Sequence, residues 1–224
     1  LIKPFYTEEN ITHKEIDRIN HYLTLMETET RRVSRIASNL LSFSRQAKME
    51  LTPLDLNRLV EKTLMVNANL LKIHNIKVEK RLDPDIPRII GSEDQLQQVF
   101  MNIISNAAEA MEGVENAVLT LETRPASDAS AVVLVLRDTG AGIPERNLPR
   151  LFEPFFTTKK KGKGVGLGLS VAYGIIQEHG GTMHVDSEVG QGTAFTVELP
   201  LKQRTDAQNG GGGPDERHQD SDRR

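Results

Sequence analysis

Three glycine-bearing segments interrupt the second half of this chain: 138–144, 162–170 and the pair Gly180-Gly181. Each lies beside a stretch predicted to be a helix or a strand. Glycine permits positive φ and close approach of the backbone to a ligand, so such segments change the chain direction or cradle phosphates at a helix start. The second segment has the layout of a phosphate loop, but it lacks the Gly-Lys-Ser/Thr ending of a Walker motif.

Short strands and helices are predicted to alternate around these segments. Apolar, β-branched runs predict strands at 77–82, 88–91, 117–123, 132–138, 182–187 and 194–199. Helical periodicity predicts helices at 55–72, 93–111 and 168–179. Because short turns join several neighbouring strands, the pattern favours an α/β, or α+β, two-layer sandwich with a mixed β-sheet.

The first part of the chain has a different hydrophobic pattern. From Ile16 to Ser44, apolar and small residues recur at alternating steps of three and four, which predicts one long helix over about 12–46 with a heptad seam. Such a seam requires a partner helix in a bundle. We therefore expect four regions: the helical part at 1–46, a linker at 47–54, the compact domain at 55–202 and a disordered tail at 203–224.

Composition narrows the functional classes. The formal net charge of -3 provides no basic field for nucleic acid, and the lack of cysteine excludes disulfides and thiolate metal sites. No run approaches the roughly 18 apolar residues of a membrane span. The expected location is cytoplasmic, with any membrane attachment supplied by regions upstream of Leu1. We also expect the chain to begin within the end of another element, with something upstream cut away.

Two sets of polar residues are candidates for ligand chemistry. Asp138 ends an apolar strand, where a carboxylate requires a partner: a ligand N–H group or a neighbouring backbone N–H. Asn102 and Asn106 lie four residues apart on one face of an otherwise apolar helix. An amide oxygen suits Mg²⁺, which takes its other ligands from nucleotide phosphates and water. Packing or capping is the simpler alternative for either amide.

Together these pieces resemble the nucleotide-binding boxes of the histidine kinase catalytic domain, within the superfamily that also contains gyrase, Hsp90 and MutL. The asparagine box is 102–110, the first glycine box 138–144, the phenylalanine box 152–158 and the second glycine box 164–170. The end of the predicted long helix, 39–45, is similar to the second helix of the family's dimerisation hairpin. The resemblance implies the Bergerat ATP-binding fold.

The resemblance also implies roles. Asp138 would accept a hydrogen bond from the adenine amino group, Asn106 would hold Mg²⁺ with the ATP phosphates, and Asn102 would lie nearby as a second catalytic residue. Residues 144–163 would form a cationic lid. The remaining ATP-binding candidates are Gly140, Gly142, Ile143, Lys159, Lys161, Gly164, Val165, Gly166, Leu167, Gly168 and Leu169, and the lid candidates are Phe152, Phe155, Phe156, Thr157 and Thr158.

Three functions compete within this resemblance. Gyrase-type ATPases place a water-activating glutamate one turn before the Mg²⁺ ligand, where this chain has Asn102. An amide is no general base, which favours a histidine kinase that acts as a homodimer and passes phosphate to a response-regulator receiver domain. A superfamily ATPase and a non-catalytic ATP-binding adaptor are the alternatives. No histidine here has the setting of a phosphoacceptor, so we expect that residue upstream and no autophosphorylation by this chain alone.

Overall fold

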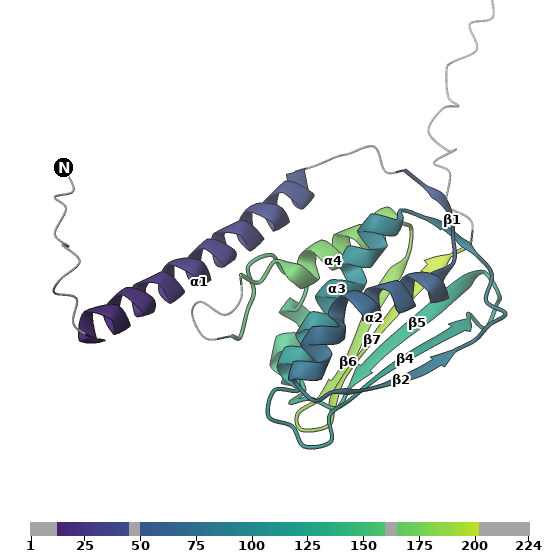
Figure 1. Cartoon of the computed structure of the whole chain (residues 1–224). Helices are drawn as coiled ribbons and strands as arrows, with labels where there is room; N and C mark the ends of the chain where they lie inside the picture. The colour runs from purple at the N-terminus through teal and green to yellow at the C-terminus, as the bar shows by residue number, and fades with distance from the viewer. Residues whose placement is uncertain (1–12, 45–49, 160–164, 202–224) are drawn as a thin grey trace, which may run out of the picture.

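A computed structural model describes residues 13–44, 50–159 and 165–201, with the side chains of the first helix described over 14–30. Two sheets and four α-helices form the described structure (Figure 1). The elements are α1 (His13–Ser44), β1 (Thr52–Leu54), α2 (Leu56–Ile73), β2 (Lys77–Leu82), β3 (Ile89–Gly91), α3 (Glu93–Ala110), β4 (Val118–Pro125), β5 (Ala131–Asp138), the 3-10 helix η1 (Glu145–Arg150), α4 (Gly168–Glu178), β6 (Thr182–Glu188) and β7 (Gly192–Pro200).

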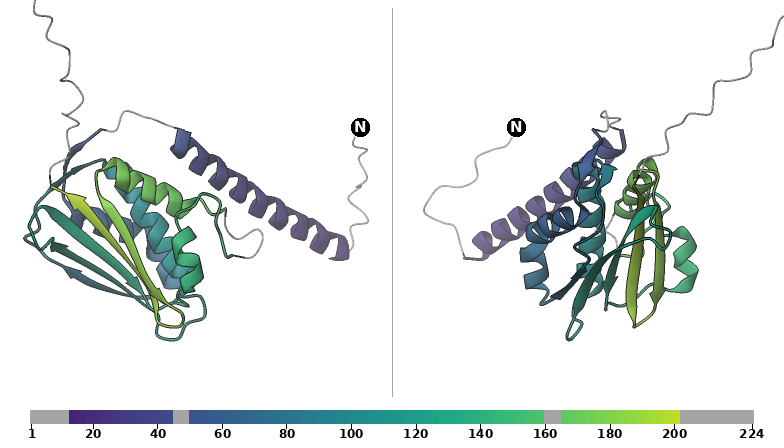
Figure 2. Two further views of the ribbon diagram at one scale, coloured as in Figure 1. Left: turned by 180° about the vertical axis from the view of Figure 1, so that it is seen from behind. Right: turned by 90° about the vertical axis from the view of Figure 1, so that its right-hand side faces the viewer.

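The main sheet has the strand order β2-β4-β5-β7-β6. β2 pairs with β4 in parallel, and the other neighbours are antiparallel. Helices α2, α3 and α4 cover one face of this sheet, as the two views of Figure 2 show. The predicted two-layer sandwich with a mixed sheet is therefore confirmed.

The core lies between the helices and the strands. β4 alternates buried and partly exposed side chains, so that Leu119 and Leu121 face the helices. The antiparallel register sets Leu121 opposite Leu136 and Leu134 opposite Val197. Helix α3 contributes the largest buried side chain, Phe100, and lies centrally between α2 and α4.

Helix α2 begins after a capping residue, Asp55. The Asp55 carboxylate accepts a hydrogen bond from the Arg58 backbone N–H at 3.1 Å, which satisfies one of the free donors at the helix start. Thr123 of β4 donates to the Asn57 side-chain oxygen at 2.7 Å and thereby ties the helix to the sheet. These contacts fix the packing of α2 against β4.

One segment that the sequence placed in the linker is regular structure. Thr52–Leu54 forms β1, which pairs with β3 in a small antiparallel sheet. The three-residue strand contains Pro53 and only one buried side chain, Leu54, so its sequence carries no alternation to detect. The expected boundaries at 47–54 and 55–202 remain predictions, and the tail at 203–224 lies outside the described residues.

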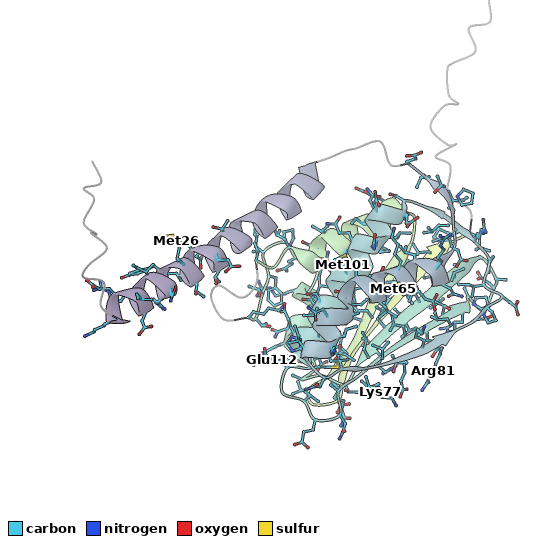
Figure 3. The ribbon with its side chains drawn as sticks, viewed as in Figure 1. Met26, Met65, Lys77, Arg81, Met101 and Glu112 are labelled. Carbon is cyan, nitrogen blue, oxygen red and sulfur yellow. The ribbon has the colours of Figure 1, made fainter. Side chains whose placement is uncertain are left out.

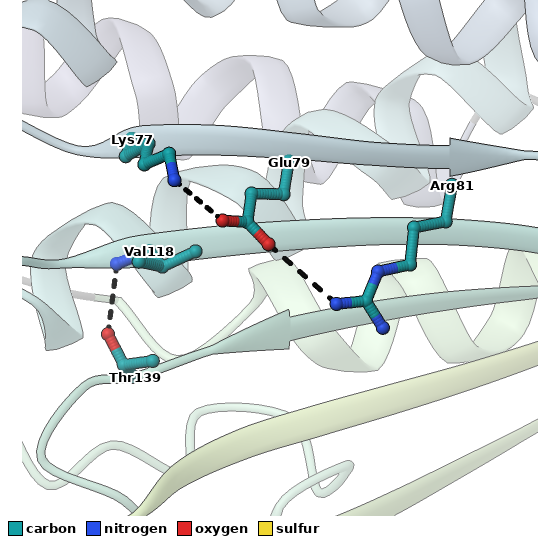
Figure 4. A network of polar contacts seen from close by, with 5 residues as sticks. All are labelled: Lys77, Glu79, Arg81, Val118 and Thr139. Atoms are coloured by element: carbon teal, nitrogen blue, oxygen red, sulfur yellow. Dashed lines mark hydrogen bonds and ion pairs between the residues drawn. The ribbon is translucent and has the colours of Figure 1, made fainter.

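The second face of the main sheet carries charged side chains. Along the edge strand β2, the Glu79 carboxylate accepts a hydrogen bond from Lys77 Nζ at 2.8 Å and lies 3.8 Å from an Arg81 nitrogen (Figure 4). These cations lower the pKa of Glu79, the Lys77 hydrogen bond having the larger effect. Charges of this kind discourage pairing of the exposed strand edge with another chain.

Helix α1 differs from the other helices because no side chain described between residues 14 and 30 is buried. Its seam residues are exposed by 42% at Ile16, 56% at Leu23 and 64% at Met26, and Figure 3 shows Met26 on this helix. The helix fulfils the prediction for this region, and the seam residues whose side chains are described, Ile16 to Met26, are exposed. None of the described helices is both long enough and apolar enough to cross a membrane.

Candidate nucleotide site

Asp138 occupies the last position of β5 and is 3% exposed. Its Oδ1 accepts hydrogen bonds from the backbone N–H groups of Gly140 at 2.8 Å and Thr193 at 3.2 Å. Burial raises the pKa of this carboxyl group, and the two hydrogen bonds oppose that shift. Neighbouring backbone N–H groups thus satisfy one oxygen. Both bonds from described residues go to Oδ1, so Oδ2 is available to accept a hydrogen bond from a ligand.

The first glycine segment is held between two other backbones. A Cβ atom at Gly140 would lie 2.7 Å from the carbonyl oxygen of Ala110, at the end of α3. Gly142 has a φ of 70°, and its Cβ would lie 2.0 Å from the carbonyl oxygen of Glu188 at the end of β6. These two glycines are therefore required by close backbone packing beside Asp138.

Two hydroxyl groups that the sequence analysis missed complete this end of the site. Ile143, a predicted site residue, donates its backbone N–H to Ser187 Oγ at 2.8 Å. Ser187 Oγ lies 2.9 Å from Thr193 Oγ1, and the Thr193 backbone is the second donor to Asp138. Gly192 has a φ of 102°, and a Cβ atom there would lie 2.0 Å from the Asp138 carbonyl oxygen. This glycine is the sequence feature that could have indicated the close approach of the two strands.

The two predicted amides lie on α3, further from Asp138. Asn102 Nδ2 donates to the Gly168 carbonyl at 2.9 Å and thereby joins α3 to the first residue of α4. Asn106 Oδ1 accepts a hydrogen bond from Lys159 Nζ at 3.0 Å. The same ammonium group also donates to the Glu109 carboxylate. The amide oxygen of Asn106 therefore faces a cation, as an oxygen ligand of Mg²⁺ would.

The second glycine segment is anchored to the phenylalanine box. The Phe155 backbone N–H donates to the Gly166 carbonyl at 2.9 Å. Gly166 has a φ of 73°, and its Cβ would lie 2.5 Å from Phe155 and Phe156 backbone atoms. Helix α4 begins two residues later at Gly168. The buried Leu167 precedes it, and its second residue, Leu169, is half-buried. Lys161 and Gly164 lie outside the described residues, and Val165 is the first residue described after them.

The phenylalanine box combines packed and exposed rings. Phe152 stacks on Tyr173 of α4 with 4.7 Å between the ring centroids, and the Arg150 guanidinium lies 4.5 Å from the centre of Phe156. Phe155 is 64% exposed. Thr157 Oγ1 accepts the Lys159 backbone N–H at 3.2 Å, and Thr158 is exposed. The predicted lid also contains an element that the sequence did not indicate, η1 at Glu145–Arg150.

His179 is the buried C-terminal cap of α4. Its position at the end of α4 favours a partly charged imidazole. Instead the ring is 1% exposed, and burial lowers the pKa of its imidazole. Nε2 accepts the Ser92 backbone N–H at 3.0 Å, and Nδ1 lies 2.7 Å from the Ile175 carbonyl oxygen and donates to it. A neutral ring therefore links the end of α4 to the start of α3.

The geometry brings the predicted residues to two places along α3, its last residue and its middle. Asp138 and the first glycine segment adjoin its last residue, Ala110, and the second glycine segment adjoins Asn102. No cluster of three or more histidine, cysteine or acidic side chains suited to a metal ion exists within residues 13–44, 50–159 and 165–201. A metal ion at Asn106 would therefore need ligands from a bound phosphate compound.

This chain was compared with known protein families and with individual relatives. Residues 91–203 match the model of the family described as histidine kinase-, DNA gyrase B-, and HSP90-like ATPase. Sporulation kinase E of Bacillus subtilis is 36% identical over 186 residues, which cover 83% of this chain and 24% of that protein. The chain thus spans about a quarter of the length of this relative.

Solved structures show the same fold. The catalytic domain of histidine kinase ThkA is 30% identical, with a TM-score of 0.61, and the match covers 68% of this chain and 97% of that domain. ThkA in complex with the response regulator TrrA is 25% identical, with a TM-score of 0.68, over 87% of this chain and 54% of that one. The second match covers more of this chain than the first.

Proposed function

Because this chain belongs to the family of histidine kinase-, DNA gyrase B- and HSP90-like ATPases, we propose that it is the ATP-binding catalytic region of a sensor histidine kinase. In the proposed reaction the γ-phosphoryl group of ATP passes to an imidazole nitrogen of the dimerisation hairpin, and ADP leaves. The observation that carries the proposal is the amide side chain of Asn102 one helical turn before Asn106, with its Nδ2 bound to the Gly168 carbonyl.

Asn102 distinguishes phosphotransfer from hydrolysis. A water-activating residue must accept a proton, and a carboxamide does not do so at neutral pH. Asn102 instead donates to the start of α4, so its role is to position that helix beside α3. Without a general base at this position, a protein imidazole is a better acceptor for the phosphoryl group than water is. This favours the kinase over a gyrase-type ATPase.

Asp138 is the proposed adenine reader. Two backbone N–H groups orient its carboxylate through Oδ1, and Oδ2 is then available to accept the exocyclic amino group of adenine. A buried carboxylate is costly without partners, so a ligand donor at Oδ2 would stabilise the complex. The first glycine segment contributes the close backbone packing that allows this approach.

The phosphates are proposed to lie between α3 and the start of α4. The second glycine segment precedes α4, whose first N–H groups form the positive end of a helix. Asn106 offers its amide oxygen toward this region, and Lys159 supplies a positive charge beside it. Bound Mg²⁺ would neutralise charge on the β- and γ-phosphates.

The partners follow from α1. Its exposed seam residues, including Ile19 and Leu23, require a helical partner, and we propose a homodimer formed through a helical hairpin. A second proposed partner is a receiver domain, which is supported by the ThkA structure that contains a response regulator. We further propose that this region works in the cytoplasm.

Phosphotransfer to a supplied acceptor tests the proposal. The chain is mixed with γ-labelled Mg·ATP and a separately produced dimerisation hairpin that carries its histidine. We expect acid-labile, base-stable label on the hairpin, and loss of that label in Asn106→Ala and Asp138→Ala. Nucleotide binding without any label on the hairpin would instead support the non-catalytic adaptor.

A further inference from the structure

One ammonium group connects the predicted lid to helix α3. Lys159 Nζ donates to Asn106 Oδ1 at 3.0 Å and to Oε2 of Glu109. Asn106 and Glu109 are three residues apart on α3 and therefore present their oxygens on the same face of the helix. Asn106 and Lys159 are predicted site residues, whereas the sequence pattern predicts no role for Glu109. The three groups form a compact set: a cation, a neutral oxygen and an anionic oxygen.

The set has the chemistry of a small cation site. Amide and carboxylate oxygens are the protein ligands that suit hard divalent cations. The orientation of Asn106 matters, because its oxygen, and not its nitrogen, faces the ammonium group. A second cation could not approach these oxygens closely while the Lys159 ammonium remains, because like charges repel strongly at such distances. Occupancy by Lys159 and by a metal ion are thus mutually exclusive.

We propose that Asn106 and Glu109 form a cation site that Lys159 fills in the nucleotide-free chain, and that the Mg²⁺ of a bound nucleotide displaces this ammonium group. Glu109 is then a positioning residue that first holds Lys159 and then attracts the metal ion. Lys159 is a built-in competitor of the metal. This inference rests on the proposed function, because it requires a nucleotide that arrives with Mg²⁺.

The exposure of the two side chains is suited to exchange. Lys159 is 35% exposed and Glu109 37%, so water reaches both partners as they separate. Partly exposed ion pairs are weak, which makes displacement by a divalent ion feasible. The same helix offers a matched control: Glu93 pairs with Lys62 at 2.6 Å, with exposures of 47% and 51%. Within the described residues, neither Glu93 nor Lys62 is hydrogen-bonded to Asn102 or Asn106.

The test measures how nucleotide binding depends on Mg²⁺. A fluorescent, non-hydrolysable ATP analogue is held at a fixed concentration, and MgCl₂ is titrated into wild type, Lys159→Met and Glu109→Gln. We expect the half-maximal Mg²⁺ concentration to fall about two- to fivefold in Lys159→Met, since a competitor worth a weak ion pair is removed. In Glu109→Gln it should rise about tenfold, as when a group that supports a metal ligand is lost.

The controls decide between a cation site and a general charge effect. Lys62→Met and Glu93→Gln change the same charges on α2 and α3 and should leave the half-maximal Mg²⁺ concentration unchanged. Glu109→Asp keeps the charge and should lie within about threefold of wild type. Thermal melting of each variant verifies that it is folded.

Defined outcomes overturn the inference. An unchanged or increased half-maximal Mg²⁺ concentration in Lys159→Met shows that Lys159 does not compete with the metal. A Glu109→Gln response equal to that of Glu93→Gln removes Glu109 from the site. If folded wild type binds the analogue at no Mg²⁺ concentration, the proposed function fails and this inference fails with it, whereas Mg²⁺-dependent binding with unaltered variants defeats the inference alone.

Discussion

The two ends of the candidate site are held by different kinds of contact. At the base end, Asp138 is 3% exposed and receives two backbone N–H groups, beside glycines that allow backbones to touch. At the phosphate end, Asn106 and Glu109 meet Lys159 through side-chain atoms, and the charged pair is more than a third exposed. The comparison teaches that one end is fixed by the fold and the other by contacts that can exchange.

This difference suits what each end of the site must do. A base reader needs one hydrogen-bond geometry, and a buried carboxylate fixed by backbone donors provides it. A phosphate end must admit a metal ion and a charged group and then release a product. Weak, partly exposed ion pairs separate at little cost in free energy.

The largest expected effect is at the backbone contacts of the base end. Gly142→Ala places a Cβ 2.0 Å from the Glu188 carbonyl oxygen at a φ of 70°, so we expect a loss of roughly 3 kcal/mol or more in the free energy of unfolding. Gly113→Ala is the matched control, because its φ is 79° but nothing lies within 4 Å of its Cβ; about 1 kcal/mol should be lost there. Urea denaturation measures both, and equal losses would contradict the account.

Asp138→Asn should separate recognition from folding. The Asn side-chain oxygen can still accept from Gly140 and Thr193, but an NH₂ group then faces the adenine donor. We expect ATP affinity to fall about 100-fold, equivalent to roughly 3 kcal/mol. Calorimetric titration with ATP and with the inosine nucleotide, which lacks the amino group, checks the cause: wild type should prefer ATP, and the variant should not.

The same group predicts the sign of a pH effect. Burial raises the pKa of Asp138 in the folded state. Above that pKa the buried charge lowers the stability of the fold, and this loss of stability disappears as the pH falls and the carboxyl group takes up a proton. Asp138→Asn should therefore not lower the melting temperature at neutral pH. A clear loss of stability there would show that the negative charge itself supports the fold.

Sequence reasoning reached the base end more completely than the phosphate end. An aspartate after an apolar strand and glycines spaced around a tight turn are local patterns, and the structure brings them together beside Asp138. Ser187 and Thr193 were missed because their contacts with Ile143 and Asp138 span 44 and 55 residues of sequence. The ion pair between Lys159 and Glu109 joins positions 50 residues apart, and no periodicity in the sequence predicts it.

The fold was likewise predicted where patterns are strong. The six predicted strands and the four predicted helices each lie within a few residues of an observed element. The strand β1 and the 3-10 helix η1 are too short to display a period. The charge of His179 depends on burial between α4 and the start of α3, which is a tertiary property.

His179→Gln should give a smaller, pH-dependent loss of stability. The folded-state pKa of His179 lies below its ordinary value of 6.5, so its stabilising contribution is complete above that value and declines as the pH falls below it. We expect wild type to lose stability as the pH falls below about 6.5, and the variant to be about 1–2 kcal/mol less stable at pH 8 but to show a flatter profile. His184→Gln, at an exposed position, is the control and should match wild type.

The smallest expected effect on stability is at the phosphate end. Lys159→Met removes a partly exposed ion pair, so the free energy of unfolding should change by no more than about 0.5 kcal/mol. Chemical denaturation of the variant beside wild type provides the measurement. A loss as large as that expected for Gly142→Ala would mean that the phosphate end is structural, and the contrast between the two ends would be wrong.

Release of phosphate from γ-labelled Mg·ATP by the chain alone, with no acceptor present, tests the central claim most directly. With Asn102 in the place of a general base, we predict that ATP binds and that release is negligible beside the label transferred when the histidine-bearing hairpin is added. Steady release without the hairpin, abolished in Asn106→Ala, would contradict the kinase assignment and place this chain among the ATPases of its family.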